Sequence, residues 1–323
     1  MQKLAVMTSG GDAPGMNAAT RAVVRSAVAR GCEVAGIYHG YTGLIAGDFR
    51  TLGPRDVGGI IHLGGTMLGT TRCERLRSAE GREAAVAALR ANHVDALVVI
   101  GGNGSQTGAF ALAQLGVPIV GIASSIDNDV MGCDVSIGAT TAIDIALENI
   151  DRLRVTASAM HRAFLVEVMG RHCGHLALVS GIAGGAEVIV VPEEPVDAET
   201  VAAELRAVYT RGKSHAIAVV AEGAGYNTDA LVQYFKEHKS RLGFDLRVTR
   251  LGHIQRGGTP GSFDRMLGTQ MGAAAVEAAA AGNFGVFIGQ RDGRTAAISL
   301  AEAAGKTRPA DLNLLKLARI LAQ

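Results

Sequence analysis

Residues 8–17, Thr-Ser-Gly-Gly-Asp-Ala-Pro-Gly-Met-Asn, form a glycine-rich stretch close to the start of the chain. They follow the apolar run 4–7, which is typical of a buried strand, and a helical pattern begins at once with Ala18, Ala22 and Val23 on one apolar face. Glycines allow backbone N–H groups to approach an anion closely, and the N-terminus of the following helix adds a partial positive charge. A strand, a glycine turn and a helix in this order predict a site for a phosphorylated ligand.

The composition limits the classes of protein and partner to be considered. The chain has 323 residues, 48% of them hydrophobic, so it can bury a large core and has the length of about two domains. Its 31 Lys and Arg residues balance 30 Asp and Glu residues, so we expect neither nucleic acid nor a membrane as a partner. The apolar stretches are strand-sized or interrupted, which predicts no membrane span, and no signal-peptide pattern is present. Four widely spaced cysteines are expected to be free thiols in a reducing, cytoplasmic setting; they are Cys32, Cys73, Cys133 and Cys173.

Short Val-, Ile- and Ala-rich runs alternate with helical patterns, which predicts an α/β fold with doubly wound, mainly parallel sheets. We expect strands over 3–8, 33–38, 96–100, 118–122, 163–168, 187–191, 215–220, 247–251 and 284–288. We expect helices over 16–30, 79–92, 105–114, 139–154, 197–211, 228–238, 263–281 and 312–321. In such folds ligands bind at the carboxyl ends of the strands. Glycine-rich segments follow several expected strands, so we expect four loops to converge on one sheet edge: 9–15, 101–104, 121–129 and 169–174.

Two carboxylates flank Asn128 in the segment 124–129. Asp127 and Asp129 are two positions apart, so in an extended stretch both would face one side. One could then take a proton from a hydroxyl while the other organises a cation or a sugar. The alternative is an Asx-rich turn with solvated carboxylates.

Residues 101–105, Gly-Gly-Asn-Gly-Ser, follow an expected strand and open a helix. This pattern suits close approach of the backbone to phosphate, and Ser105 could cap the helix or reach the ligand. The alternative is an ordinary strand–helix turn. The segment lacks the lysine of a Walker loop and the third glycine of a dinucleotide fingerprint, and protein-kinase signatures are absent from the chain.

Arginines also lie beside expected strand ends or glycine turns, where guanidinium forks suit phosphate binding; they are Arg162, Arg171, Arg247 and Arg256. Any one of them alone could be a surface charge. His253 lies in the same glycine- and arginine-rich stretch as Arg256. His172 and His175 have the spacing of a metal pair but lack a third ligand nearby, so we do not predict a metal there.

Several segments, in their order and spacing, resemble the bacterial ATP-type 6-phosphofructokinases. They are SGGDAPGMN at 9–17, GGNGS at 101–105, SIDND at 125–129, EVMGRHCG at 167–174, AEG at 221–223 and LGHIQRGG at 251–258. The resemblance covers nearly the whole chain. It implies two α/β domains, a phosphoryl-donor domain of residues 1–138 with 251–305 and a sugar-phosphate domain of 139–250 with 306–323. It also implies a homotetramer with fructose 6-phosphate, ATP and Mg²⁺ as ligands.

The resemblance further implies a role for each matching residue. Asp127 would be the base for the 1-hydroxyl of the sugar, and Arg171 with the Gly11 backbone would stabilise the transferring phosphoryl group. The residues that would hold the sugar phosphate are Ser125, Asp129, Met169, Gly170, Glu222, His253 and Arg256, with Arg162 and Arg247 from a neighbouring subunit. Those that would line the nucleotide pocket are Gly11, Arg72, Cys73, Gly102, Asn103, Gly104, Ser105 and Gly108.

A regulatory site is implied as well, for a nucleotide or phosphoenolpyruvate effector at a subunit interface. The matching residues are Arg21, Arg25, Arg154, Gly185, Glu187, Arg211 and Lys213. Pro54 departs from the family, which often has an arginine there, although Arg55 follows. The alternative for these cations is a solvated basic face.

Three departures fall on the donor side. The family's magnesium-binding aspartate is Asn103 here, which keeps an oxygen but loses a negative charge. Ser124 replaces a glycine, and Cys73 replaces an aromatic residue of the nucleotide pocket. The sequence therefore leaves three hypotheses: an ATP-dependent 6-phosphofructokinase, a catalytically weak paralogue that binds sugar phosphate and effectors, and the same enzyme with another donor, such as pyrophosphate, or with another sugar phosphate. Gly104 argues against pyrophosphate, because pyrophosphate-dependent relatives carry aspartate there.

Overall fold

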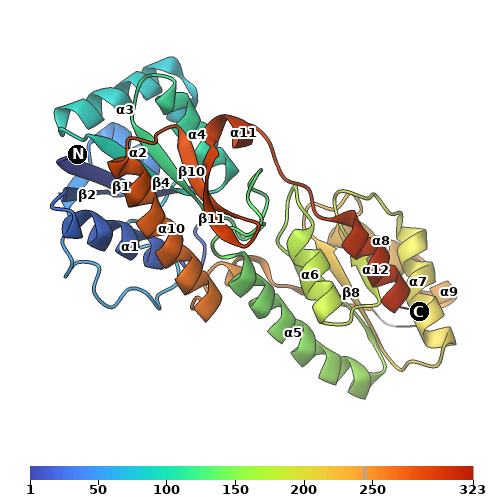
Figure 1. Cartoon of the computed structure of the whole chain (residues 1–323). Coiled ribbons are helices and arrows are strands. Elements are labelled where there is room, and N and C mark those ends of the chain that lie inside the picture. The colour runs from blue at the N-terminus through green and yellow to red at the C-terminus, as the bar shows by residue number, and fades with distance from the viewer. Residues whose placement is uncertain (243, 245, 323) are drawn as a thin grey trace. The chain divides into compact units, whose positions relative to one another are not determined.

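The computed structural model describes residues 1–242, 244 and 246–322 of the chain (Figure 1). The fold consists of two compact units, and each is described by itself. Unit 1 comprises Met1–Thr141 with Arg256–Arg308, and unit 2 comprises Ala142–Gln255 with Pro309–Gln323. The boundaries after residues 141, 255 and 308 lie three to five residues beyond the expected 138, 250 and 305.

Within its described residues, unit 1 is built on a seven-stranded sheet of order β11-β10-β5-β4-β1-β2-β3. The strands are β1 (Lys3–Ser9), β2 (Glu33–Ile37), β3 (Phe49–Thr51), β4 (Ala96–Gly101), β5 (Ile119–Ala123), β10 (Val286–Arg291) and β11 (Arg294–Ser299). The central strands are parallel, while β3 and β11 pair antiparallel at the two edges. The central strands are continuous apolar runs because helices cover both faces of the sheet.

The helices of unit 1 form two layers around this sheet. On one side α1 (Met16–Ala29) packs along α10 (Ser262–Ala280), and on the other lie α2 (Gly40–Ala46), α3 (Ala79–Ala91), α4 (Asn103–Ala113) and α11 (Leu300–Ala303) (Figure 1). The chain also forms the 3₁₀ turns η1 (Glu74–Arg77) in unit 1 and η2 (Gly252–Gln255) in unit 2. Alternate residues of β1 illustrate the layering, since Ala5 and Met7 belong to the core under α2, α3 and α4.

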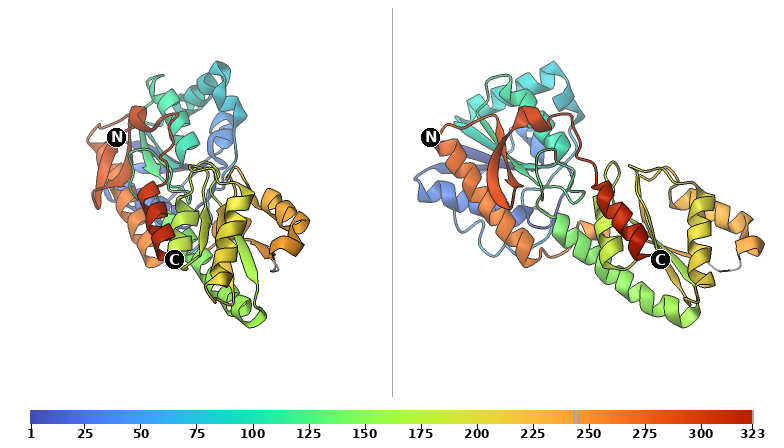
Figure 2. Two further views of the ribbon diagram at one scale, coloured as in Figure 1. Left: turned by 90° about the vertical axis from the view of Figure 1, so that its right-hand side faces the viewer. Right: turned by 45° about the vertical axis from the view of Figure 1, so that its right-hand side comes forward.

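Unit 2 has a smaller sheet, which within the described residues is four-stranded, parallel and ordered β7-β8-β6-β9. Its strands are β6 (Ala163–Val168), β7 (Val188–Val190), β8 (Ala216–Ala221) and β9 (Leu246–Arg250). The helices α6 (His175–Ala183) and α12 (Leu312–Leu321) pack together on one side, and α7 (Ala198–Thr210) and α8 (Thr228–Glu237) on the other (Figure 2). The long helix α5 (Ala139–Met160) begins at the end of unit 1, and its Ile150 contacts the C-terminal cap of α6.

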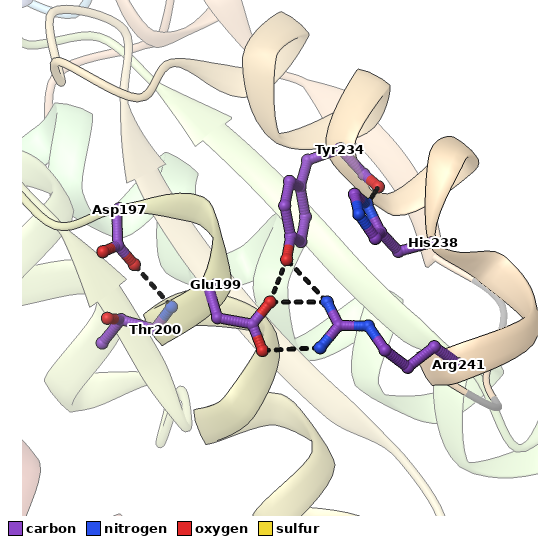
Figure 3. A network of polar contacts seen from close by, with 6 residues as sticks. All are labelled: Asp197, Glu199, Thr200, Tyr234, His238 and Arg241. Atoms are coloured by element: carbon purple, nitrogen blue, oxygen red, sulfur yellow. Dashed lines mark hydrogen bonds and ion pairs between the residues drawn. The ribbon is translucent and has the colours of Figure 1, made fainter.

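A polar network ties α7 to α8 and to the short helix α9 (Lys239–Leu242) on the outer side of unit 2 (Figure 3). The Arg241 guanidinium donates to both oxygens of Glu199, at 2.8 and 2.5 Å, and to the Tyr234 hydroxyl at 2.6 Å. The Tyr234 hydroxyl also donates to Glu199, and its ring stacks on His238 with 4.2 Å between centroids. The hydrogen bond from Arg241 lowers the pKa of the Glu199 carboxyl below its ordinary value. The network adds exposed charged contacts to the apolar packing of α8 and α9, which bury Leu231, Phe235 and Leu242 in the core of unit 2.

The α/β fold with two mainly parallel sheets is confirmed, and each expected strand and helix is present to within six residues at its ends. The expectation that four loops converge on one edge is wrong. The loops after β1, β4 and β5 share an edge of the larger sheet, but 169–174 follows β6 in the other sheet. Among the described residues, no helix is long and apolar enough to cross a membrane, and all four cysteines are free thiols.

Candidate active site and effector residues

The register of the larger sheet brings three strand ends of unit 1 to one level. Ser9 pairs with Gly101, and Gly101 pairs with Ala123, so β1, β4 and β5 all end side by side. The three following loops therefore start from a common edge: 10–15, 102–105 and 124–129. This placement is the one expected for a ligand site in a parallel sheet.

Arg256, the first residue of the second segment of unit 1, lies against the first of these loops. A Cβ built at Gly11 would lie 2.9 Å from the Arg256 Cζ and closer still to Nη1, so the guanidinium occupies the space beside the bare glycine backbone. The Arg256 Nε is buried and has no hydrogen-bond partner among the described residues. Gly10 adopts a φ of 85°, and its carbonyl accepts a hydrogen bond from Thr70 at 2.8 Å. The Arg256 guanidinium and the Gly11 backbone thus lie together, an arrangement that suits an anion.

The second loop opens directly into α4, which begins at Asn103 rather than at residue 105. Gly104 is exposed, with open space where a side chain would lie, as expected where a ligand approaches the helix N-terminus. Ser105 does not cap the helix, because it lies within the first turn and its side chain packs against Gly10 and Gly101. The interpretation of Ser105 as a cap is therefore wrong, since the helix starts two residues earlier.

Tyr41 is buried against α4, beside residues that are expected to line the nucleotide pocket. Its hydroxyl donates to the Ser105 carbonyl at 2.7 Å, and its ring fills the space beside Gly108. Burial, with a smaller contribution from the neighbouring Cys73 thiol, raises the pKa of the Tyr41 hydroxyl far above its ordinary value. Cys73 is half-buried against the same core, while Arg72 is exposed. An aromatic residue therefore lies beneath the position where Cys73 departs from the family.

The third loop is a turn and not an extended stretch. Residues 126–127 turn, and Asn128 has a left-handed φ of 52°. The argument that Asp127 and Asp129 share a side through strand-like alternation is therefore wrong. Asn128 stabilises the turn instead, because its side chain accepts from the Ser136 N–H at 2.8 Å and donates to the Asp134 carbonyl at 2.9 Å. Asp127 and Asp129 are both half-buried, which also argues against fully solvated carboxylates.

Asp129 is hydrogen-bonded to the second loop and to its own loop. Asn103 Nδ2 donates to Asp129 Oδ2 at 2.7 Å and to the Asp129 carbonyl at 3.0 Å. The Ser125 hydroxyl donates to Oδ1 at 2.8 Å. Gly102 packs on the Ser125 side chain, so the loops 102–105 and 124–129 form one connected surface.

Magnesium ligands are sparse at this edge. The described residues contain no group of three or more His, Cys, Asp or Glu side chains with the arrangement of a metal site. Asn103 Oδ1 is buried and lacks a hydrogen-bond partner among the described residues, so it is one oxygen available to a hard cation. His172 and His175 belong to no such group within the part of the chain that the structure describes.

Three of the residues expected to hold the sugar lie at the carboxyl edge of the smaller sheet. Val168 pairs with Ala221, so Met169–Arg171 and Glu222 leave neighbouring strands together. The Gly223 N–H donates to the Gly170 carbonyl at 3.2 Å, and a Cβ at Gly223 would overlap the Arg171 backbone. Arg171 is exposed, and His253 is exposed beyond the end of β9.

Two residues that the sequence did not single out fix this edge. Gln255 is fully buried, and its Oε1 accepts from the Met169 N–H at 2.9 Å. Glu193 accepts from the Gly174 N–H at 2.9 Å and from the Ala310 N–H at 2.8 Å. Gln255 lies inside the glycine- and arginine-rich stretch 251–258, which is the signal that could have indicated it; nothing in the local sequence marks Glu193.

Arg162 and Arg247 lie at the opposite edge of the same sheet. Arg162 immediately precedes β6, and Arg247 pairs with Phe164 near the start of that strand. At the rise of a β-strand, Arg247 lies roughly 16 Å and Arg162 roughly 23 Å along β6 from Met169, where the loop that carries Arg171 begins. An open pocket of about 1170 Å³ at their edge is lined by Arg162, Arg206, Lys213 and Lys236 among others.

Most of the expected effector residues of unit 2 lie together. The Arg154 guanidinium packs over Gly185, and its Nη2 is buried without a partner among the described residues. Glu187 accepts from the Ile217 N–H at 2.7 Å and pairs with Lys213 at 3.3 Å. Burial, and then the charge of Glu187, raises the pKa of the Tyr209 hydroxyl to about 12.

The remaining effector residues are placed differently. Arg211 is exposed and donates to the Ala322 carbonyl at 2.8 Å, so it contacts the C-terminal end of the chain. Arg21 and Arg25 lie one turn apart on α1 in unit 1, and Arg25 donates to the Pro54 carbonyl at 3.3 Å. Pro54 therefore contributes a backbone acceptor near these cations where the family often has an arginine.

Comparisons with known proteins agree with these features. A family profile described as Phosphofructokinase matches residues 3–279. The chain is 50% identical over 324 residues to the ATP-dependent 6-phosphofructokinase 1 of Thermus thermophilus and 45% identical over 322 residues to the ATP-dependent 6-phosphofructokinase of Natranaerobius thermophilus, with full coverage of each chain.

Solved structures show the same fold. The phosphofructokinase of Pichia pastoris in the T-state has a TM-score of 0.88 at 40% identity, over 94% of this chain and 35% of that chain. A pyrophosphate-dependent phosphofructokinase of Marinobacter aquaeolei has a TM-score of 0.87 at 22% identity, over 97% of this chain and 86% of that chain. Because the family profile covers most of the sequence and the relatives match it from end to end, the chain belongs to the phosphofructokinase family.

Proposed function

We propose that this protein transfers a phosphoryl group from ATP to the 1-hydroxyl of fructose 6-phosphate, which gives fructose 1,6-bisphosphate in cytoplasmic glycolysis. The full-length identity of 50% to a protein named ATP-dependent 6-phosphofructokinase carries this proposal. The common edge formed by Ser9, Gly101 and Ala123 supports it, because it brings the base and the phosphate-binding turns into one unit.

The chemistry follows from the groups at that edge. Asp127 takes the proton of the sugar 1-hydroxyl as that oxygen attacks the terminal phosphorus of ATP, the bond from this phosphorus to the β,γ-bridging oxygen breaks, and ADP leaves. Gly11 offers a bare backbone, and Arg256 places a guanidinium beside it. The resemblance assigns Arg256 to the sugar phosphate, but its place beside Gly11 leads us to assign it to the phosphoryl group instead, where it would meet the charge that develops on the phosphoryl oxygens. The N-terminus of α4 adds the partial charge of its backbone N–H groups. Arg171 is assigned to the same phosphoryl group by its place in the matching segment 167–174.

Mg²⁺ fits this site mainly as a cation carried by the phosphates of the nucleotide. Asn103 Oδ1 is the protein oxygen that would contact it, because this buried atom lacks a partner among the described residues. When bound, the ion neutralises phosphate charge and so eases the attack of the sugar hydroxyl. Asn103 supplies a neutral ligand rather than a carboxylate, so we expect Mg²⁺ to bind more weakly than with aspartate at this position.

Each sugar phosphate is bound by two subunits. One subunit contributes the carboxyl edge of its smaller sheet, and its neighbour contributes the opposite edge of the same sheet. Met169, Gly170 and Glu222 at the carboxyl edge act within one subunit. Arg162 and Arg247 lie at the other edge, roughly 16 to 23 Å away along β6, so they cannot close on the same sugar. We assign them to the 6-phosphate in the site of a neighbouring subunit, which requires a homo-oligomer and agrees with a tetramer.

One observation favours a second candidate function. Asn103 removes a charge on the donor side, which would suit a weak paralogue that binds sugar phosphate and effectors. Against this, the turn that carries Asp127 and Asp129 is fully built. Gly104 remains a glycine with open space around it, which suits ATP rather than pyrophosphate.

The test is formation of fructose 1,6-bisphosphate from fructose 6-phosphate with ATP or pyrophosphate across a Mg²⁺ series. We expect turnover with ATP and a loss of about 10²–10⁴-fold in kcat for Asp127→Asn, with an unchanged melting temperature. Glu83→Gln, an exposed carboxyl on α3, is the matched control and should retain full activity. Sugar-phosphate binding without turnover from either donor would instead support the weak paralogue.

Shared sites predict complementation between inactive variants. Asp127→Ala and Arg162→Ala are each expected to be inactive alone, and mixed oligomers should regain activity because some sites then combine an intact Asp127 with an intact neighbouring Arg162. Asp127→Ala/Arg162→Ala alone is the control. No regain in oligomers shown by mass to be mixed, or a fully active monomer, would contradict the shared site.

We further propose that the cluster of Arg154, Gly185, Glu187 and Lys213 binds a nucleotide or phosphoenolpyruvate effector. The buried, unpartnered Arg154 nitrogen supports an anion at this position. Arg154→Ala should abolish the response of fructose 6-phosphate saturation to these effectors while it leaves kcat without effector within about twofold.

A further inference from the structure

Asn103 and Asp129 form a contact whose geometry fixes the orientation of the amide. Both hydrogens of the Asn103 Nδ2 are used, one toward Asp129 Oδ2 at 2.7 Å and one toward the Asp129 carbonyl at 3.0 Å. Both partners can only accept, so the amide nitrogen and not its oxygen must face them. The bond to the carboxylate is charge-assisted and therefore among the stronger hydrogen bonds of the loop.

The two carboxylate oxygens and the carbonyl oxygen of Asp129 all accept hydrogen bonds. Ser125 Oγ donates to Oδ1 at 2.8 Å, and the Arg308 N–H donates to the Asp129 carbonyl at 2.8 Å. The adjacent Val130 forms a β-bridge with Thr307. The Asn103 amide is the contribution of α4 to this arrangement, so it connects the donor-side helix to the sugar-side carboxylate.

A carboxylate at position 103 would reverse this interaction. Its oxygen would face Asp129 Oδ2 and the Asp129 carbonyl at hydrogen-bond distance, and three acceptors would meet without a proton among them. Such a pair is held together by a cation or by a shared proton, because like charges this close repel strongly. The amide removes that need.

We propose that Asn103 is a positioning residue that holds Asp129 in its sugar-binding place without a divalent cation. The assignment of Asp129 to the sugar rests on the proposed function. The inference that the Asn103 amide takes the place of a cation at Asp129 does not rest on it. The acidic loop of this chain is therefore arranged before Mg²⁺ and nucleotide arrive, and fructose 6-phosphate binding should not depend on Mg²⁺.

The first test is the melting temperature of the full chain in EDTA and in MgCl₂, at an ionic strength matched with NaCl and without nucleotide or sugar. We expect no Mg²⁺ effect on the wild-type chain. Asn103→Asp should melt about 4 °C or more lower in EDTA, the size expected for loss of a charge-assisted hydrogen bond, and Mg²⁺ should restore it. Asn283→Asp, an exposed site in unit 1, controls for the added charge and should show neither change.

A second variant keeps the test decisive if Asn103→Asp folds poorly. Asn103→Asp/Asp129→Asn exchanges the two groups, so one carboxylate again faces one amide. We expect its melting temperature in EDTA to lie above that of Asn103→Asp and not to respond to Mg²⁺. Equal melting of Asn103→Asp and the control in EDTA, or a fall that Mg²⁺ leaves unchanged, would overturn the proposal.

Calorimetric binding of fructose 6-phosphate in EDTA gives the functional readout. The wild-type affinity should match that in MgCl₂ within about twofold, and Asn103→Asp should bind about tenfold more weakly in EDTA alone. A wild-type affinity that falls as sharply in EDTA would refute the positioning role. No binding under any condition, with the melting pattern intact, would instead refute the proposed function and leave the contact with Asn103 standing.

Discussion

Replacement of Gly11 by alanine should separate catalysis from folding at the donor turn. The new Cβ would lie 2.9 Å from the Arg256 Cζ and closer still to Nη1, whereas ordinary contact begins at 3.4 Å. The guanidinium must therefore retreat by about 1 Å, a misplacement that costs about 10²-fold in rate when it affects a catalytic group. The obstacle is the far end of a flexible side chain and Gly11 has no left-handed φ, so the free energy of unfolding should change by less than about 1 kcal/mol.

The assay is steady-state kinetics with ATP and fructose 6-phosphate, together with urea unfolding. Gly257→Ala is the matched control, because this neighbouring glycine has open space at its Cβ position, and we expect it to keep wild-type kcat. If the loss acts through Arg256, Gly11→Ala added to Arg256→Ala should cost little more than Arg256→Ala alone. Wild-type kcat/KM for Gly11→Ala, or additive losses in the double variant, would refute the reasoning.

Three further predictions concern residues outside the donor turn. Asp264 is fully buried and accepts hydrogen bonds of 2.6–2.8 Å from the Gly138 N–H and from the Thr141 N–H and hydroxyl. Asp264→Ala should therefore lower the free energy of unfolding, measured with urea, by about 2–5 kcal/mol. Glu193→Ala should lower kcat and stability together because the loop that carries Arg171 loses its anchor, and Glu193→Gln should restore part of both. The lowered pKa of Glu199 means that its stabilising contribution is complete above the ordinary pKa of a glutamate and is lost as the pH falls through its lower folded value. The hydrogen-exchange protection of α8, corrected for the intrinsic exchange rate at each pH, should therefore fall on acidification, and Glu199→Gln should remove that change in protection.

The main elements of the fold could be predicted because buried parallel strands are continuous apolar runs. Residues 96–100 and 163–168 are clear examples, since helices cover both faces of each sheet. The edge strands β3 and β11 could not be predicted, because they are short or polar and pair antiparallel outside the apolar centre. Helix α2 was missed for a related reason, since glycines at 40 and 43 hide its periodicity.

The candidate site could be predicted as a set of residues but not as a geometry. Sequence spacing placed Asp127 and Asp129 on an extended segment, whereas Asn128 turns the chain through a left-handed φ. Spacing also gave no sign that Arg162 and Arg171 lie at opposite edges of β6, because that depends on strand register and direction. Long-range anchors such as Glu193, whose partner Ala310 is 117 residues away, have no local signal at all.

The Asn103 departure shows why a residue change should be judged with its neighbours. In the sequence, Asn103 replaces the aspartate that the resemblance leads one to expect, so a negative charge that would face Mg²⁺ is lost. In the structure the same amide donates to Asp129, so the loop loses a carboxylate and gains a hydrogen bond that neutralises the remaining one in part. A chain with two carboxylates in contact needs the cation both to organise the loop and to carry the donor phosphates. Under the proposed function, a chain with one carboxylate and one amide would need the cation only for the phosphates, so weaker Mg²⁺ binding would be compatible with retained catalysis.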